Sequence, residues 1–329
     1  MKELMKAILV EEEEGVSKMK WADAPYPRPT ASGQVLVRVK AAGVNRPDIL
    51  QRDRKYEPPA DASPILGLEV AGIVEQVYGD SRWRPGDEVC ALTHGGGYAE
   101  YVWVDERHCL PKPAGWSFTE AASLPETFFT VWFNVFQQGR LGANGKSENL
   151  LVHAGASGIG VAAIQIAKAL GHRVAITARK EHQLAICKSV GADEAILLEE
   201  DWSDNLLKRF GKVDVVLDML GESTFSGNLD VFRPHGRLVY IAFLTGAKVE
   251  LSIPKLMRKQ ITLTGSFLRP QSFSTKASIA EDLKNQVWPM IESGKIKPII
   301  ERTFPIQEVQ QAHELMEKGG HVGKIVLTL

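Results

Sequence analysis

Long apolar runs are missing from this sequence. Nowhere do 18 apolar residues follow one another, which predicts that no helix of the chain crosses a membrane. The first apolar stretch comprises only Met5 and residues 7–10, and four glutamates follow it at 11–14. A secretory signal needs a longer apolar stretch and no acidic run, so we expect no leader of that kind. The glutamates themselves are typical of a solvated turn.

Cysteines are few, and neither sign of charge dominates. Cys90, Cys109 and Cys187 form no C-x-x-C pair, which excludes a zinc ribbon or a redox dithiol, and three residues do not make a closed disulfide set. No N-x-S/T glycosylation sequon occurs. Lys and Arg number 39 against 40 Asp and Glu, so no electrostatic attraction to nucleic acid or to an anionic membrane is expected. These absences favour a reduced, soluble protein of the cytoplasm.

The 329 residues, 44% of them apolar, are enough for about two domains. Up to about residue 120 the pattern is one of short strands, such as 34–39, 70–77 and 88–92, separated by turns. After about residue 150, apolar strands alternate with amphipathic helices, which predicts a parallel sheet covered on both faces. From about residue 271 a helix near 307–318 and a last strand at 324–329 follow. We expect this segment to return to the first domain.

A glycine-rich turn carries the strongest local signal. Residues 151–160, LVHAGASGIG, lie between a predicted strand at 149–154 and a predicted helix at 159–170. Gly155 and Gly160 match the first and third glycines of a G-x-G-x-x-G dinucleotide motif, and Ser157 stands at the second. Such a turn lets the backbone approach a pyrophosphate that rests on the helix N-terminus. Ordinary tight turns use the same residues, but the strand–turn–helix context favours dinucleotide binding.

The end of the next predicted strand bears on which dinucleotide binds. NAD sites place an Asp or Glu there for the ribose hydroxyls, whereas this chain continues from Thr177 and Ala178 into Arg179 and Lys180. Two cations favour the 2′-phosphate of NADPH over NADH, unless they are merely solvated loop charges. His153, beside the turn, is expected to be a packed, hydrogen-bonded residue rather than a proton shuttle.

Taken together, these motifs resemble the zinc-independent quinone oxidoreductases of the medium-chain dehydrogenase/reductase superfamily. Within that family the pattern is most similar to the branch of the p53-inducible quinone oxidoreductases, and less similar to the zeta-crystallins. The resemblance extends over nearly the whole chain. Its motifs are VNRPD at 44–48, QR at 51–52, YEPP at 56–59, ILGLE at 65–69, PGD at 85–87, GGGYAEY at 95–101, LPET at 124–127, the glycine turn, and GKIVL at 323–327.

The resemblance implies an α/β protein of two domains. Residues 1–122 and 271–329 would form a GroES-like, β-rich catalytic domain, and residues 123–270 a Rossmann domain with a doubly wound parallel sheet. It also implies a homodimer joined edge to edge through the cofactor-domain sheets, by a strand near 261–265.

Zinc-dependent members of the superfamily differ from this chain at two ligand positions. Asn45 stands where they carry a cysteine and Leu68 where they carry a histidine, and neither binds zinc as a thiolate or imidazole does. The segment 90–98 also lacks the four-cysteine lobe of a structural zinc. Without a Lewis acid, alcohol oxidation loses its main electrostatic assistance. A quinone or a conjugated enone needs that help less, because its π-system delocalises the incoming charge.

The resemblance assigns roles to individual residues. Tyr56 would line the quinone site and orient the acceptor, and Asn45 would lie near the nicotinamide ribose; these two are the expected catalytic residues. The alternative to these roles is that Tyr56 lies in a surface loop without a function, and that Thr130 (expected near the nicotinamide) only packs within a helix. The expected cofactor contacts are Thr130, Gly155, Ala156, Ser157, Gly158, Ile159, Gly160, Thr177, Arg179, Lys180, Phe243, Phe267, Leu268, Arg269 and Lys324.

Some positions depart from the family pattern. Many relatives have a serine where this chain has Lys180, a lysine where it has Gln183, and a tyrosine where it has Leu198. The phosphate contacts have therefore either moved onto Arg179 and Lys180 or become less selective.

Three functions remain open at this stage. The first is transfer of a hydride from NADPH to a quinone, without zinc. The second is reduction of the carbon–carbon double bond of an enone by the same residues. The third is a protein that binds NADPH but has a structural or regulatory role.

Overall fold

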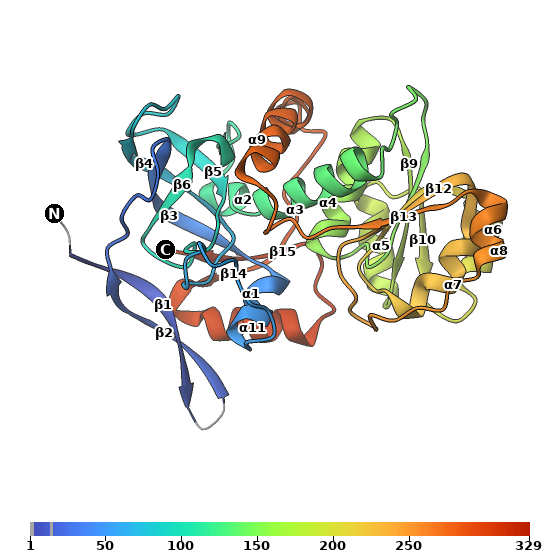
Figure 1. The fold of residues 1–329 in the computed structure, drawn as a ribbon, viewed down its shortest axis with the longest axis horizontal. Helices are drawn as coiled ribbons and strands as arrows, with labels where there is room; N and C mark the ends of the chain where they lie inside the picture. The colour runs from blue at the N-terminus through green and yellow to red at the C-terminus, as the bar shows by residue number, and fades with distance from the viewer. Residues whose placement is uncertain (1–2, 14–15) are drawn as a thin grey trace.

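The computed structural model describes residues 3–13 and 16–329, which form two lobes side by side (Figure 1). In the β-rich lobe, β14 (Ile300–Pro305), β15 (Lys324–Thr328), β3 (Gln34–Val44), β4 (Glu69–Tyr78), β5 (Glu88–Leu92) and β7 (Cys109–Pro111) pair in that order, and β6 (Tyr101–Asp105) also pairs with β3. The last strand, β15, runs antiparallel to β3. The C-terminal segment therefore returns to the sheet of the first lobe.

An N-terminal hairpin of β1 (Leu4–Glu13) and β2 (Val16–Pro25) projects from this lobe (Figure 1). It corrects one expectation, because Glu11 and Glu12 continue β1 instead of forming a turn. Both are exposed, as a solvated acidic run should be, and Glu14 lies outside the described residues. The strand persists because its middle residues, such as Ala7 and Ile8, are buried in the core, while Leu4 and Val10 toward its ends are exposed.

The second lobe is a six-stranded parallel sheet with the order β10-β9-β8-β11-β12-β13. Its strands are β8 (Asn149–Val152), β9 (Arg173–Ala178), β10 (Glu194–Leu197), β11 (Val213–Asp218), β12 (Phe232–Tyr240) and β13 (Thr262–Gly265). In chain order this is 3-2-1-4-5-6, the Rossmann arrangement, whose direction reverses between β8 and β11. The connecting helices are α4 (Gly158–Ala169), α5 (Glu181–Val190), α6 (Trp202–Arg209), α7 (Glu222–Val231) and α8 (Ile253–Lys259).

Most of these elements begin and end close to where the sequence pattern predicts. The largest difference is β12, predicted from 237 but starting at Phe232. Pro234 and Gly236 conceal the earlier start, since in a sequence both residue types are typical of a loop. The predicted helix near 307–318 is split into a short turn, η4 (Ile306–Glu308), and α11 (Val309–Lys318).

Further helical segments lie outside the connections of the parallel sheet. They are α1 (Arg46–Arg52), α2 (Phe118–Ala121), α3 (Pro125–Val131), the π-helical η2 (Trp132–Gln138), α9 (Phe273–Asp282), η3 (Leu283–Val287), also π-helical, and α10 (Trp288–Glu292). One apolar cluster runs from Leu110 of the β-rich sheet through Phe128 and Phe129 of α3 to Val152 and Ile176 of the parallel sheet. The lobes therefore share a continuous core on this side, and α3 is held at their junction. Whether the domain boundaries fall at 122/123 and 270/271 stays a prediction.

Candidate functional site

The glycine turn follows β8 and opens α4, as the sequence predicts. The Ser157 hydroxyl caps the helix by accepting a hydrogen bond from the Gly160 backbone N–H at 3.1 Å. A Cβ on Gly155 would collide with Ile176, and one on Gly160 would collide with the Gly155 backbone. Glycine is required at both positions because the chain passes so close to itself. The turn thus presents free backbone N–H groups and a helix N-terminus, which suit a phosphate.

The carboxyl end of β9 leads directly to two cations. Arg179 and Lys180 are exposed, and no ion pair within residues 3–13 and 16–329 includes either of them. The Lys180 Nζ would be 2.6 Å from a Cβ on Gly320, so these cations lie beside the 319–320 loop. Thr177, in contrast, is fully buried and its hydroxyl is 2.8 Å from His153 Nδ1.

His153 is a packed core residue. Its Nε2 is 2.8 Å from Asn228 Oδ1, and its ring meets Trp202 edge-on. With both ring nitrogens hydrogen-bonded inside the core, it has no atom available for a substrate.

The strand β15 meets the glycine turn at the junction of the lobes. The Gly323 N–H donates to the Ala156 carbonyl at 2.9 Å, and the side chain of Lys324 lies against Gly158. Lys324 is almost fully buried, and its ammonium is 2.6 Å from both Glu69 Oε1 and Asn45 Oδ1. Asn45 Nδ2 donates to the same Glu69 oxygen at 2.8 Å. Lys324 and Asn45 therefore belong to one buried network centred on Glu69.

That network extends in two directions. The other carboxylate oxygen of Glu69 accepts from the Glu126 backbone N–H at 2.8 Å, which fixes the first turn of α3. Asp48 accepts from the N–H groups of Asn45 and Gly67 at 2.8 and 3.0 Å. Burial is the main reason that the pKa of Asp48 is raised to about 6, although these N–H donors and Lys324 oppose it.

Tyr56 and Arg269 lie against each other. The half-buried Tyr56 ring lies 5.6 Å from the Arg269 guanidinium carbon, and burial raises the pKa of its phenol. Arg269 is buried and donates from Nη1 to Gln51 Oε1 at 2.7 Å, while its backbone carbonyl accepts from Lys276 Nζ at 2.7 Å. Of the predicted residues, the structure thus brings Tyr56 to Arg269.

The remaining predicted contacts lie at the carboxyl edge of the parallel sheet or on α3. Phe243 follows β12 and Phe267 follows β13, and both side chains are more than half exposed. Leu268 is buried, as is Thr130, whose carbonyl accepts from Asn134 Nδ2 at 2.9 Å. In an open α/β sheet, this edge is where ligands bind.

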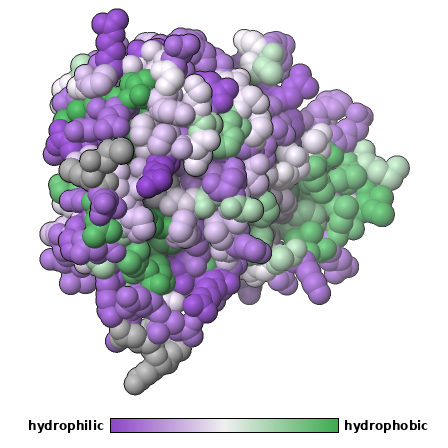
Figure 2. Space-filling view, turned by 60° about the vertical axis from the view of Figure 1, so that its left-hand side comes forward, coloured by the Kyte–Doolittle hydropathy of each residue, from purple (hydrophilic) through white to green (hydrophobic). Residues whose placement is uncertain are grey.

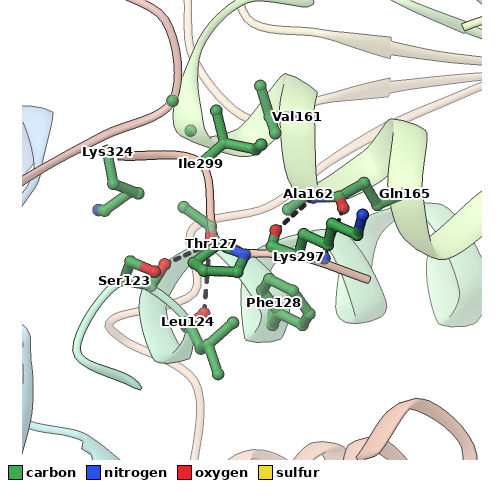
Figure 3. A pocket seen from close by; sticks show the side chains of 13 residues that line it. Ser123, Leu124, Thr127, Phe128, Val161, Ala162, Gln165, Lys297, Ile299 and Lys324 are labelled. Carbon is green, nitrogen blue, oxygen red and sulfur yellow. Dashed lines mark hydrogen bonds between the residues drawn. The ribbon is translucent and has the colours of Figure 1, made fainter. Parts of the chain in front are cut away.

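A small pocket lies beside this junction, where α3, α4 and the segment 297–299 meet (Figure 3). Thr127 points its hydroxyl back to the Ser123 and Leu124 carbonyls, at 3.3 and 3.2 Å. Gln165 and the Lys297 backbone exchange two hydrogen bonds across the pocket, at 3.0 and 2.8 Å. The side-chain hydrogen bonds of Thr127 and Gln165 are thus made within the protein, which favours a structural role for this pocket.

Sequence reasoning assigned no role to Asp48, Glu69, Glu126 or Lys276. The first three fall inside the quoted motifs, and the signal that could have found them is a carboxylate beside an otherwise apolar stretch, as in LGLEVAG. Within the described residues, no three His, Cys, Asp or Glu side chains are grouped so as to hold a metal ion. None of the described helices is long and apolar enough to traverse a bilayer.

Two family models match the chain: an alcohol dehydrogenase GroES-like domain over residues 31–114 and a zinc-binding dehydrogenase domain over 158–293. A quinone oxidoreductase of Rattus norvegicus is 32% identical over 99% of this chain and 98% of its own.

Solved structures with this fold include enzymes of several descriptions. A quinone oxidoreductase from Thermus thermophilus, also solved in complex with NADPH, has a TM-score of 0.81 and 30% identity, covering 99% of this chain and all of its own. An NAD-dependent alcohol dehydrogenase (TM-score 0.83, 29% identity) and the CurK enoyl reductase (0.82, 26%) each cover 99% of both chains.

Proposed function

We propose that this protein reduces a quinone with NADPH and without zinc. The chain belongs to the quinone oxidoreductase family of the medium-chain dehydrogenase/reductase superfamily, and it is therefore an oxidoreductase. The observation that carries the proposal is the pair of unpaired cations, Arg179 and Lys180, beyond the end of β9. They lie one strand away from a glycine turn that a Cβ would block. Because β9 ends in Thr177 and Ala178, no carboxylate occupies the strand end where NAD sites carry one.

The residues present fit NADPH. The backbone of residues 155–160 and the N-terminus of α4 would hold the pyrophosphate, and Arg179 and Lys180 the 2′-phosphate. Thr130, Phe243 and residues 267–269 would surround the nicotinamide. When bound, this cofactor supplies a hydride.

The protein's own groups bind and orient the acceptor. Tyr56 keeps its proton at neutral pH, because an ordinary phenol has a pKa of about 10 and burial raises it further. It can therefore donate a hydrogen bond to an acceptor oxygen without carrying charge. Asn45 is held in place by its hydrogen bonds to Lys324 and Glu69. It therefore helps to position the ligands and does not act as a proton donor.

Zinc independence is supported by what occupies the two ligand positions. Leu68 is a buried hydrocarbon, and the Asn45 oxygen accepts from the Lys324 ammonium. A metal ion placed there would have to displace a cation that already neutralises Glu69. Elemental analysis of the purified protein tests this part of the proposal, and stoichiometric zinc would contradict it.

One set of rates tests the activity. NADPH and NADH oxidation should be followed side by side with an ortho-quinone, a para-quinone and a simple enone. We expect NADPH to be oxidised faster than NADH, and quinones to be reduced faster than the enone. The similarity to the CurK enoyl reductase favours enone reduction as the second candidate. Tight NADPH binding without turnover on any acceptor would instead indicate a structural or regulatory protein.

The cofactor preference has its own test in the double variant R179Q/K180Q. Each lost phosphate contact is a charge-assisted hydrogen bond worth about 1.5–3 kcal/mol, so the KM for NADPH should rise at least about tenfold. The KM for NADH should change little. K188Q, which removes an exposed lysine on the far turn of α5, is the matched control. Equal losses for both nucleotides would refute the assignment.

We also propose a homodimer joined through the edge strand β13. Figure 2 shows apolar side chains gathered at the end of the parallel-sheet lobe. The exposed apolar residues of this region are Val249, Leu251, Ile253, Met257 and Leu263. A strand edge that exposes apolar side chains favours pairing with another strand. Placement in the cytoplasm and the absence of nucleic-acid or membrane partners stay predictions from composition.

A further inference from the structure

Arg269, which lies against Tyr56, and Lys276, which donates to the Arg269 carbonyl, are buried cations with no ion pair among the described residues. Arg269 is 8% exposed and Lys276 is 3% exposed. Within residues 3–13 and 16–329, no ion pair includes either side chain, although exposed lysines and arginines elsewhere do form such pairs. Removing a charge from water costs several kcal/mol unless it is paired. Two such charges side by side are therefore a feature that packing alone does not explain.

The hydrogen bonds of the pair are also incomplete. Arg269 Nη1 donates to Gln51, but its Nε and Nη2 are buried and have no partner among the described residues. Lys276 Nζ donates to the Arg269 carbonyl, and its remaining ammonium hydrogens have no other described acceptor. An unsatisfied buried donor costs about 1–3 kcal/mol. These free donors can form hydrogen bonds with a ligand atom that carries negative charge.

At neutral pH the ionised carboxylate that acts on this pair is Asp61, which is exposed to water. Burial raises the pKa of Glu126 to about 8, so this carboxyl is mostly protonated. Burial lowers the pKa of Lys276 to about 8, so most of it keeps its charge. Asp61 is exposed and lies 3.0 Å from His94, whose pKa is lowered mainly by burial. Tyr56 is neutral.

We propose that Arg269 and Lys276 form a cationic site for the carbonyl oxygen of the acceptor, which becomes an oxyanion during reduction. This inference rests on the proposed function. When a hydride adds to a conjugated carbonyl acceptor, a C–H bond forms, a π bond breaks, and its electron pair moves to oxygen. The hydride and its two electrons would come from NADPH, and a proton from water would then neutralise the oxygen. Preformed cations aimed at the developing charge lower the barrier.

The position of the cluster agrees with this role. Arg269 lies against Tyr56, and Lys276 lies on α9, which Figure 1 places between the two lobes. Phe273, at the start of α9, packs against His94 and His108 and so fixes the helix to the β-rich lobe. The two cations are thereby held beside Tyr56, which is proposed to orient the acceptor, whereas Arg179 and Lys180 follow β9 at the proposed nucleotide site.

Binding of 4-nitrophenol to the free protein tests the site without cofactor or turnover. Its phenolate resembles the reduced acceptor and absorbs visible light, so its pKa is read directly from a spectrum. We expect binding to lower that pKa by about one unit or more, which is a tenfold preference for the anion. In the variants R269Q and K276M, the pKa of bound 4-nitrophenol should each time move back toward its value in water. In the double variant it should return fully to that value.

Controls separate this effect from loss of structure. K284M removes an exposed lysine from η3 and should leave the titration unchanged. R269K keeps a cation with fewer donors and should restore part of the shift, and K276M is informative if R269Q does not fold. Circular dichroism and thermal unfolding identify variants that have lost the fold.

Some results would overturn the inference. Wild-type protein that binds 4-nitrophenol in its neutral form, or not at all, would do so. Variants that lose NADPH binding, measured by nucleotide fluorescence, as strongly as nitrophenolate binding would assign the cations to the cofactor instead. Failure of the proposed function is distinct, because it would show as no NADPH oxidation with any quinone while the nitrophenolate titration stays normal.

Discussion

Single side chains at the lobe junction contribute both to the stability of the fold and to the candidate site. The Lys324–Glu69 ion pair is the clearest case. Both side chains are nearly inaccessible, at 7% and 0% exposed, and they approach to 2.6 Å. Removing one partner leaves an uncompensated buried charge, which costs about 3–5 kcal/mol. K324M and E69Q should each destabilise the protein by that amount.

The double variant K324M/E69Q should recover much of this loss, because both charges leave together. Urea unfolding of all four proteins measures the coupling. If the two single losses simply add in the double variant, the pair does not act as a buried ion pair.

Glu126 should make stability depend on pH. Its pKa is about 8 in the folded protein, mainly because of burial and then because of Glu69, against about 4.3 in an unfolded chain. The folded state therefore binds the proton more tightly, and this stabilising contribution is complete at low pH. It is lost as the pH rises through the window from about 4 to about 8.

E126Q should remove that dependence. Relative to wild type, it should be more stable at about pH 9 than at about pH 5, by about 1–3 kcal/mol. Urea unfolding at both pH values measures the difference. E200Q, at an exposed carboxylate, is the matched control and should show no such trend. A difference independent of pH would mean that Glu126 ionises normally.

At the scale of elements, the strand–turn–helix around residues 149–170 could be predicted from the sequence and the buried cation cluster could not. This motif is predictable because its signals are local: glycines at 155 and 160, and apolar residues at helical spacing. Backbone sterics and burial within one short segment are enough to determine the structure there. Lys276 and Glu126 sit in short helices that look solvent-facing in sequence. Lys276 is buried and Glu126 is half-buried because residues distant in the sequence pack against them, and no spacing within one segment encodes that contact.

The cap of α4 gives a prediction at this scale. S157A removes the hydroxyl that accepts from Gly160, which should cost about 1 kcal/mol of stability. It should also weaken NADPH binding, since the same turn is proposed to hold the pyrophosphate.

S272A is the matched control for this cap. Ser272 caps α9 by accepting from the Thr275 N–H at 3.0 Å, in the same geometry. Its loss should cost similar stability but leave NADPH affinity unchanged. Thermal unfolding and nucleotide fluorescence on both variants separate helix capping from phosphate binding. Similar NADPH affinity in the two variants would remove Ser157 from the nucleotide site.

At the scale of the whole molecule, the apolar end of the parallel-sheet lobe should determine the oligomeric state. Met257 and Ile253 are 68% and 59% exposed on α8, the helix that precedes the edge strand β13 in the chain. M257E and I253K place charges in the centre of this surface, where they would be buried without partners in a dimer. Each should convert a dimer to monomers, as sedimentation velocity would show.

Exposed apolar residues on the opposite lobe supply the control for this surface. L4K changes Leu4, 57% exposed on β1, and should leave the mass of the assembly unchanged. If wild-type protein sediments as a monomer at all concentrations, the proposed interface is wrong. If M257E and I253K stay dimeric, the dimer forms elsewhere. Loss of the dimer with unchanged turnover would show that each protomer holds a complete site, as the packing of Tyr56 against the buried Arg269 within one chain implies.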